Sequence, residues 1–189
     1  MSMFKRIALV FAAVLLAACA GTTQVTDFSD RSVGYGWVDI KDASPNHISS
    51  IYVQQYRPKT AEPYYPMAFV EYKGGILFWS TALAIGAHKL DVLRGEKCLG
   101  ILCGNTTYAY NFGKQGDDVG AVVVRTPGVY HLGSYKLRDM KTGWFEEGKF
   151  EVVPASNAPS RREMLEEVLK HTTENQVMAD RIRRELARL

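Results

Sequence analysis

The sequence predicts a mostly β fold, in which an antiparallel β-sandwich of about eight or nine strands is followed by one long C-terminal α-helix. Aromatic residues make up 11% of the chain and include ten tyrosines, and such side chains suit a pleated sheet. Between residues 34 and 153, short apolar runs alternate with Gly, Pro, Asn and Asp at intervals near the 8–12 residues typical of sandwiches. Beyond residue 160, neither Gly nor Pro interrupts the chain. The expected sandwich is immunoglobulin-like or transthyretin-like.

The chain opens with the three parts of a secretory signal. Lys5 and Arg6 give a positive start, residues 7–16 form an unbroken apolar run, and small residues then lead to Cys19. The run is too short for a stable membrane span, which takes about 20 apolar residues. We therefore expect residues 1–18 to be a signal peptide.

The end of this signal, Leu16-Ala17-Ala18-Cys19, resembles the lipobox of bacterial lipoproteins. The resemblance implies that Cys19 becomes the first residue, with lipid on its sulfur and an acylated amino group. Ala20 stands where an aspartate would resemble the inner-membrane retention signal. The resemblance thus implies an outer-membrane anchor facing the periplasm. The alternative is an ordinary cleaved signal in which the cysteine is incidental.

Removal of the signal leaves 171 residues, which is enough for one domain and an appendage. The mature chain carries 21 basic and 20 acidic residues, because Lys5 and Arg6 leave with the signal. This balance, without a basic stripe outside the last helix, argues against nucleic acid as a partner. We expect a tether at residues 19–33, the sandwich at 34–153, and a hinge with the helix at 154–189.

Two cysteines remain once Cys19 is lipidated. In an oxidising periplasm, Cys98 and Cys103 are most simply a disulfide. A redox or metal role is the alternative, although four residues separate these cysteines where thioredoxin-like motifs have two. Leu99, Ile101 and Leu102 form an apolar set within this loop. Either the loop folds inward or it inserts into a neighbour.

The predicted strands follow the apolar runs and their alternation. They cover residues 34–40, 48–56, 67–72, 76–80, 86–93, 106–112, 120–125, 128–138 and 144–153. The segments Gly86-Ala87-His88-Lys89-Leu90 and Gly128-Val129-Tyr130-His131-Leu132 share a Gly-x-[His/Tyr]-x-Leu pattern. With this pattern, residues 34–153 resemble the β-sandwich modules of bacterial envelope lipoproteins, the PEGA-like and DUF2846-like groups. That resemblance implies an extracytoplasmic, non-catalytic module.

The C-terminal helix is expected to begin at a capping box, Ser160 with Glu163 three residues later. Its heptad positions suggest a seam for a partner helix or for self-association, with a polar central layer that sets the register. The seam consists of Leu165, Thr172, Ala179 and Leu186 in one register and Val168, Asn175, Ile182 and Leu189 in the other. The alternative is an amphipathic helix folded back on its own sandwich.

Residues suited to catalysis or metal binding show no convergent pattern in the sequence. The four histidines lack the pairing typical of zinc sites, and no Gly-x-Ser-x-Gly motif occurs. We therefore expect neither an enzyme nor a cofactor or metal. The aromatic pairs Phe78-Trp79 and Trp144-Phe145 offer another use. One ring of each pair must point outward unless a helix or partner covers that face.

The function predicted from these patterns is structural. We expect a lipid-anchored, non-catalytic component of an envelope assembly that contacts another envelope protein, or a second copy, through its C-terminal helix. The alternative is a module that binds glycan, peptidoglycan or a small ligand through Trp79 or Trp144.

Overall fold

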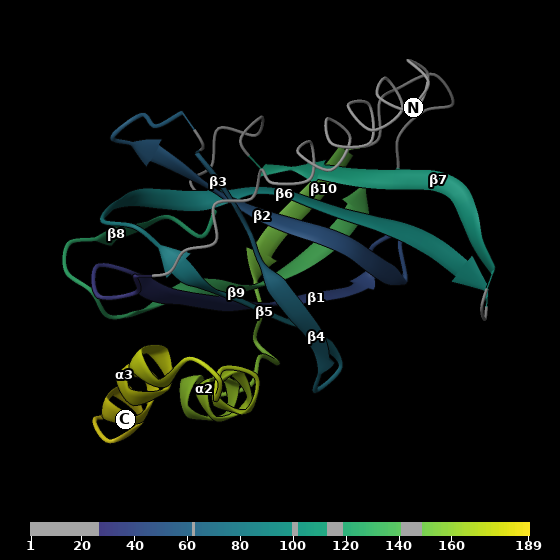
Figure 1. The fold of residues 1–189 in the computed structure, drawn as a ribbon. Coiled ribbons are helices and arrows are strands. Elements are labelled where there is room, and N and C mark those ends of the chain that lie inside the picture. Colours follow the sequence, from purple (N-terminus) through teal and green to yellow (C-terminus); the bar gives the residue numbers. More distant parts are fainter. Residues whose placement is uncertain (1–26, 62, 100–101, 113–118, 141–148) are drawn as a thin grey trace, which may run out of the picture.

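The computed structural model describes residues 27–61, 63–99, 102–112, 119–140 and 149–189. Ten strands and two helices lie in this part of the chain (Figure 1). They are β1 (Ser32–Asp42), β2 (His47–Arg57), β3 (Tyr64–Pro66), β4 (Ala68–Tyr72), β5 (Gly75–Leu83), β6 (Gly86–Leu99), β7 (Leu102–Asn111), β8 (Val122–Val124), β9 (Val129–Met140), β10 (Lys149–Pro154), α2 (Arg161–Lys170) and α3 (Gln176–Leu186). The mostly β class is confirmed.

The strands form two sheets. Sheet A has the order β10-β9-β1-β5-β4, and sheet B has the order β3-β2-β6-β7, with β8 also paired to β6. The pairs are antiparallel except that β1 runs parallel to β9. The expectation of purely antiparallel pairing was therefore wrong at this point. A parallel pair needs a long connection, and here strands β2–β8 supply it.

The two sheets share one core. Sheet A contributes Val38, Phe78 and Leu137, and sheet B contributes Ile51 and Leu93, all at most 3% exposed. A void lined by Val38, Ile51, Phe78, Leu93 and Leu137 between the sheets has a volume of about 10 Å³, which is about one water-sized sphere. These core side chains are therefore closely packed at this point.

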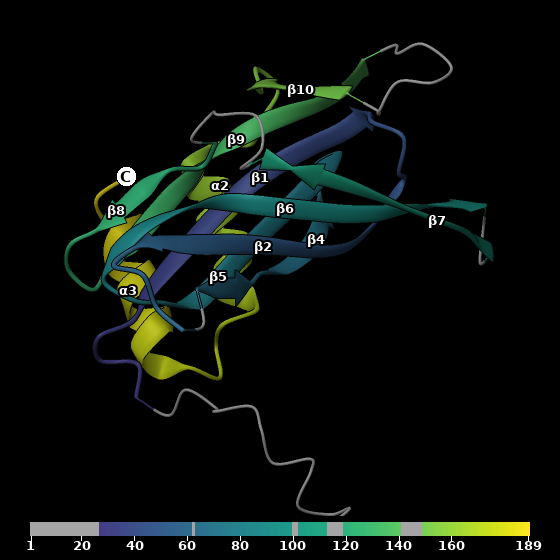
Figure 2. The ribbon, with the colours of Figure 1, turned by 90° about the horizontal axis from the view of Figure 1, so that it is seen from above.

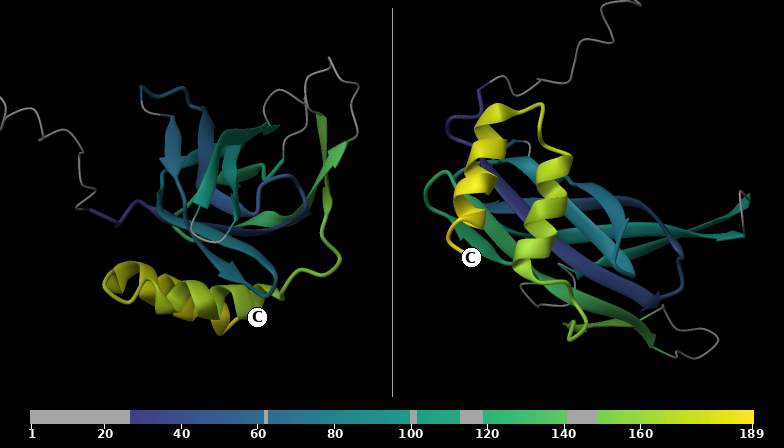
Figure 3. Two further views of the ribbon diagram at one scale, coloured as in Figure 1. Left: turned by 90° about the vertical axis from the view of Figure 1, so that its right-hand side faces the viewer. Right: turned by 90° about the horizontal axis from the view of Figure 1, so that it is seen from below.

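A second core lies on the opposite face of sheet A, where α2 and α3 pack (Figure 3). Tyr35, Trp37 and Leu77 point to the helices and are fully buried, and Trp79 is 7% exposed. Because helices cover one face and sheet B covers the other, β1 is buried from Ser32 to Asp39. The molecule therefore has three layers, helix, sheet and sheet.

The prediction of a single long C-terminal helix was wrong, because the structure has two. The predicted capping box is present, with the Glu163 amide donating to Ser160 Oγ at 3.3 Å and the Ser160 amide donating to Glu163 Oε2 at 2.9 Å. Helix α2 ends at Lys170. Two residues later, Thr172 Oγ1 donates a hydrogen bond to the Val168 carbonyl at 3.1 Å. Asn175 then caps the second helix by accepting from the Met178 amide at 3.2 Å.

The residues predicted as a polar register layer, Thr172 and Asn175, are thus the reason for the break. Thr and Asn side chains bond to nearby backbone and so compete with a continuous helix. The break lets both short helices lie on sheet A, as the view from below in Figure 3 shows. No helix in the described part of the chain is both long and apolar enough to cross a bilayer.

Candidate functional site

The most exposed large apolar side chains of the described residues lie at the end of the β6–β7 hairpin. Strand β6 pairs with β2 as far as Glu96, which faces His47, and beyond that residue it pairs only with β7. Figures 1 and 2 both show this hairpin projecting past the rest of the sheets. There Leu99 is 86% exposed and Leu102 is 73% exposed. We call Cys98, Leu99, Leu102 and Cys103 the hairpin tip.

The disulfide predicted between Cys98 and Cys103 is present and closes the hairpin tip. The two cysteines are cross-strand partners with Cα atoms 3.9 Å apart, and Leu99 and Leu102 are the next pair. Successive residues of a strand point to opposite faces. The hairpin tip therefore has a disulfide on one face and two leucines on the other.

The side chain of Asn46, in the turn before β2, binds the backbone of β6 where β2 no longer does. Asn46 Nδ2 donates to the Cys98 carbonyl and the Cys98 amide donates to Asn46 Oδ1, both at 2.7 Å. The side-chain amide of Asn46 thus makes the two hydrogen bonds to the Cys98 backbone that a neighbouring strand would otherwise make. The base of the hairpin tip is thereby held on both edges, by β7 and by Asn46.

Glu96, Cys98 and Cys103 are the one group of potential metal ligands that come within 4.8 Å of one another in the described part of the chain. Both sulfurs belong to the disulfide. A thiolate is the sulfur species that binds metal, so the oxidised hairpin tip offers a single carboxylate. This arrangement does not amount to a metal site.

The predicted helix seam lies against the protein's own sheet. Leu165, Val168, Ala179 and Ile182 are fully buried and Thr172 is 5% exposed. Leu186 is half-buried against the same cluster, Asn175 is half-buried at the α3 cap, and Leu189 is 45% exposed. A partner helix cannot reach the buried members of this set while α2 and α3 pack on sheet A. The seam as a partner contact is therefore corrected to an internal packing surface.

The predicted aromatic surface is not available at Trp79. Its indole is 7% exposed and stacks on the His171 ring, with centroids 5.1 Å apart. Helix α2 thus supplies the cover that an adjacent aromatic pair on a strand requires, while Phe78 fills the core between the sheets. Trp144 and the lipidation residue Cys19 lie outside the described residues.

A polar cluster between sheet A and the helices was missed from the sequence. Arg161 Nε donates to Tyr35 Oη at 3.2 Å, Arg161 also pairs with Glu185 at 3.6 Å, and the His131 ring lies 5.1 Å from the Tyr35 ring. Burial, and then the nearby Arg161 charge, lowers the pKa of His131 to about 4. His131 is therefore neutral at pH 7. The cluster joins residues that lie between 24 (Arg161 and Glu185) and 150 (Tyr35 and Glu185) positions apart in the chain, which no local motif reveals.

A second polar group lies at the side of the sandwich, in an open groove of about 400 Å³ between β7 and β9–β10. Asp139 accepts hydrogen bonds from Tyr110 Oη at 2.8 Å and from Ser44 Oγ. Burial raises the pKa of Tyr110, and the Asp139 carboxylate raises it further. Half-buried Tyr108 and Phe150 complete the walls of the groove.

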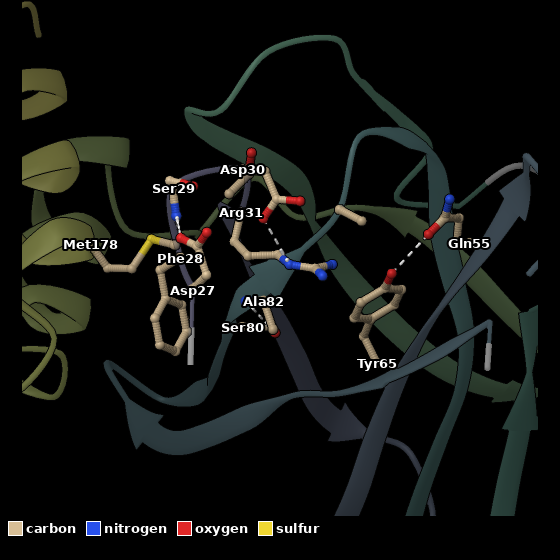
Figure 4. Close-up of polar contacts among 12 residues, drawn as sticks. Asp27, Phe28, Ser29, Asp30, Arg31, Gln55, Tyr65, Ser80, Ala82 and Met178 are labelled. Carbon is tan, nitrogen blue, oxygen red and sulfur yellow. Dashed lines mark hydrogen bonds and ion pairs between the residues drawn. The ribbon is translucent and has the colours of Figure 1, made fainter. Parts of the chain in front are cut away.

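Helix α3 fixes the place where the chain enters the domain. Arg181 donates to the carbonyls of Phe28 at 3.0 Å and Ser29 at 2.6 Å, and also to that of Arg31. Figure 4 shows Phe28 beside Met178 of α3, and Arg31 directed toward Tyr65. We call residues 27–31 the entry segment. In Figures 1 and 2 it lies at one end of the molecule and the hairpin tip lies at the other.

Comparisons with protein-family models, with curated proteins and with solved structures found no match to this chain.

Proposed function

We propose that this protein is a non-catalytic lipoprotein, anchored through Cys19 in the outer membrane and facing the periplasm, that contacts another envelope component through its hairpin tip. One observation carries the choice of contact surface. Leu99 and Leu102 are exposed side by side on a hairpin that a disulfide and Asn46 hold in place. Exposed apolar patches in a rigid setting mark interaction sites. This contact replaces the predicted helix seam, which is buried.

The arrangement of the two ends supports the anchoring role. Asp27 is eight positions after Cys19, so Cys19 can lie at most about 28 Å from the start of the domain. Three hydrogen bonds from Arg181 hold the entry segment to α3. A lipid at Cys19 would thus anchor the domain through the entry segment, which Arg181 holds to α3. The hairpin tip would stay free at the opposite end of the domain.

A non-catalytic role is supported by how the polar clusters are arranged. Arg161 donates a hydrogen bond to Tyr35, and the His131 ring lies against the Tyr35 ring, between sheet A and the helices, where these contacts stabilise the packing of the layers. A void among the described core side chains between the sheets holds only about 10 Å³. We further propose that the sheets form a sandwich of the immunoglobulin-like or transthyretin-like kind, which is a common scaffold for binding.

The anchor is tested by growing cells with labelled palmitate. We expect label on the native chain and none on Cys19→Ser, which should also leave the membrane fraction. The contact is tested by placing a photo-crosslinking amino acid at Leu99 in intact cells, with Val123 as control because it is 52% exposed on another strand. A discrete adduct from position 99 and none from position 123 is the expected result. An unlabelled native chain, or identical adducts from both positions, would remove the proposal.

The groove beside Asp139 favours a second candidate function, the binding of a saccharide such as a peptidoglycan strand. Aromatic rings of Tyr108 and Phe150 stand there beside a carboxylate that accepts hydrogen bonds from hydroxyl groups. Sedimentation with purified peptidoglycan tests this function. A glycan binder should pellet and lose that property in Tyr108→Ala, and a Leu99→Ser variant should pellet normally.

A further inference from the structure

We propose that reduction of the Cys98–Cys103 disulfide creates a zinc site, in which both cysteine thiolates and the Glu96 carboxylate bind one Zn²⁺ ion and a water molecule takes the fourth position. Such a site goes beyond the proposed function and does not depend on it. It is supported by the convergence of the three side chains, by the way in which the backbone holds them, and by the exposure of the disulfide.

The three side chains converge on one place. Their ligand atoms, the two sulfurs and a carboxylate oxygen of Glu96, all lie within 4.8 Å of one another. Ligand atoms on one tetrahedral Zn²⁺ lie about 3.6–3.8 Å apart, given Zn–S distances of about 2.3 Å and Zn–O distances of about 2.0–2.2 Å. Once the S–S bond is broken, we therefore expect side-chain rotation alone to bring the three atoms to coordination distance.

Reduction supplies the ligands that the oxidised chain lacks. A dithiol donates two electrons and two protons, which break the S–S bond and convert the two sulfurs to thiols, while the dithiol itself becomes a disulfide. Zn²⁺ then displaces one proton from each thiol, because the thiolate is the species that binds metal. The ion should thus bind to the reduced chain and not to the oxidised one.

The backbone holds the three residues in place without the disulfide. Cys98 and Cys103 are cross-strand partners in the β6–β7 ladder, and Glu96 pairs with His47 of β2. Asn46 binds the backbone of both β6 residues. Its backbone amide donates to the Glu96 carbonyl at 3.1 Å, and its side chain bonds the amide and the carbonyl of Cys98, both at 2.7 Å. The reduced hairpin therefore keeps the ligands close together, which lowers the cost of ordering them around the ion.

A reductant can reach the disulfide. It lies on the hairpin that projects past the rest of the sheets in Figures 1 and 2, where Cys103 is exposed and Cys98 is half-buried. Exposed disulfides are more easily reduced than buried structural ones. Neither cysteine belongs to the core between the sheets or to the core beneath the helices. We therefore expect reduction to change the hairpin tip and to leave the domain folded.

The test uses the mature chain with Cys19→Ser, in which Cys98 and Cys103 are the remaining cysteines. The chain is reduced with dithiothreitol, which is removed under nitrogen, and is then titrated with Zn²⁺ in competition with a chromogenic chelator. The oxidised chain is treated in the same way. Glu96→Gln removes the carboxylate, and Glu71→Gln, at an exposed glutamate of β4, is the matched control. Circular dichroism spectra identical to that of the parent establish that each variant is folded.

We expect the reduced chain to bind one Zn²⁺ ion and the oxidised chain to bind none. Glu96→Gln should weaken the affinity at least about tenfold, since loss even of an outer-shell partner of a metal costs about 10- to 100-fold, and Glu71→Gln should leave it unchanged. With Co²⁺ in place of Zn²⁺, the reduced chain should show thiolate-to-metal charge-transfer absorption, which Cys98→Ser with Cys103→Ser should abolish.

Three results would overturn the proposal. If the reduced chain binds no Zn²⁺, the ligands do not reach coordination geometry. If the oxidised chain binds Zn²⁺ as tightly as the reduced chain, the thiolates are not the ligands. If Glu96→Gln binds as tightly as Glu71→Gln, the carboxylate takes no part in the site.

Discussion

Replacement of Ile182 by alanine tests whether the C-terminal helices belong to the domain itself. Ile182 is fully buried in the cluster that joins α2 and α3 to sheet A, together with Val168 and Leu165. Removing such a side chain usually costs about 2–5 kcal/mol, since it loses transfer free energy and leaves a cavity. We expect a loss of about 3 kcal/mol in the free energy of unfolding, which lowers Tm by about 6–12 °C in a domain of this size.

Val177→Ala is the matched control. Val177 lies on the same helix but is 47% exposed, so its truncation should change the free energy of unfolding by no more than about 0.5 kcal/mol. Urea unfolding followed by circular dichroism measures both variants, and it is repeated at two protein concentrations. The midpoint should not depend on concentration, because the buried contacts are made within one chain.

Two results would refute this reasoning. If Ile182→Ala costs no more than Val177→Ala, then α3 does not pack on sheet A as described. If the urea midpoint of the native chain rises with protein concentration, the apolar seam is covered by a second copy of the chain. The predicted helix seam would then be a contact for self-association.

Three further predictions concern single residues. Gly36→Ala should cost about 2 kcal/mol or more in urea unfolding, because its Cβ would lie 2.4 Å from the Phe78 ring and 2.8 Å from the Gly133 carbonyl oxygen. Burial keeps His131 neutral and lowers its pKa to about 4, so stability should fall as pH falls from about 6.5 to 4, where only the unfolded chain gains the proton. The full shift of the His131 pKa corresponds to about 3 kcal/mol in the free energy of unfolding, and partial solvent access reduces this contribution to about 1–2 kcal/mol. His131→Gln should remove this part of the pH dependence of stability. Asn175→Ala should cost about 1 kcal/mol through loss of the α3 cap and leave the fold unchanged by circular dichroism.

Most of the strands were predictable because their signals are local, whereas β3 (Tyr64–Pro66) lies outside every predicted strand. The gap between the predicted strands at 67–72 and 76–80 falls at a turn, in which Lys73 and Gly74 have the positive φ that a tight hairpin needs, 48° and 78°. The start of the helical region was equally local, since the capping box involves residues three apart. The disulfide followed from the count of cysteines and from the oxidising compartment that the signal sequence predicts.

The layering was not predictable because it depends on contacts between distant segments. Gly34–Ile40 was expected as one strand among several, yet Tyr35 and Trp37 on its outer face need the helices to bury them. The parallel pairing of β1 with β9 joins residues almost 100 positions apart. Heptad spacing in the last 25 residues correctly identified the apolar side chains of the helices. It was wrong about what they contact, because an apolar stripe on a helix can be buried by a sheet as well as by a partner helix.

The location of the contact site follows from what the helices cover. Without α2 and α3, the outer face of sheet A would expose Tyr35, Trp37 and Trp79, and this face would be the obvious place for a partner. With the helices in place, the other exposed large apolar side chains of the described residues are at most 54% exposed, against 86% for Leu99 and 73% for Leu102. The hairpin tip thus presents the two most exposed of them together, on a backbone that Asn46 and a disulfide hold in one position. The hydrophobic effect thus packs the helices on sheet A, and the hairpin tip remains as the exposed apolar element that can contact a partner.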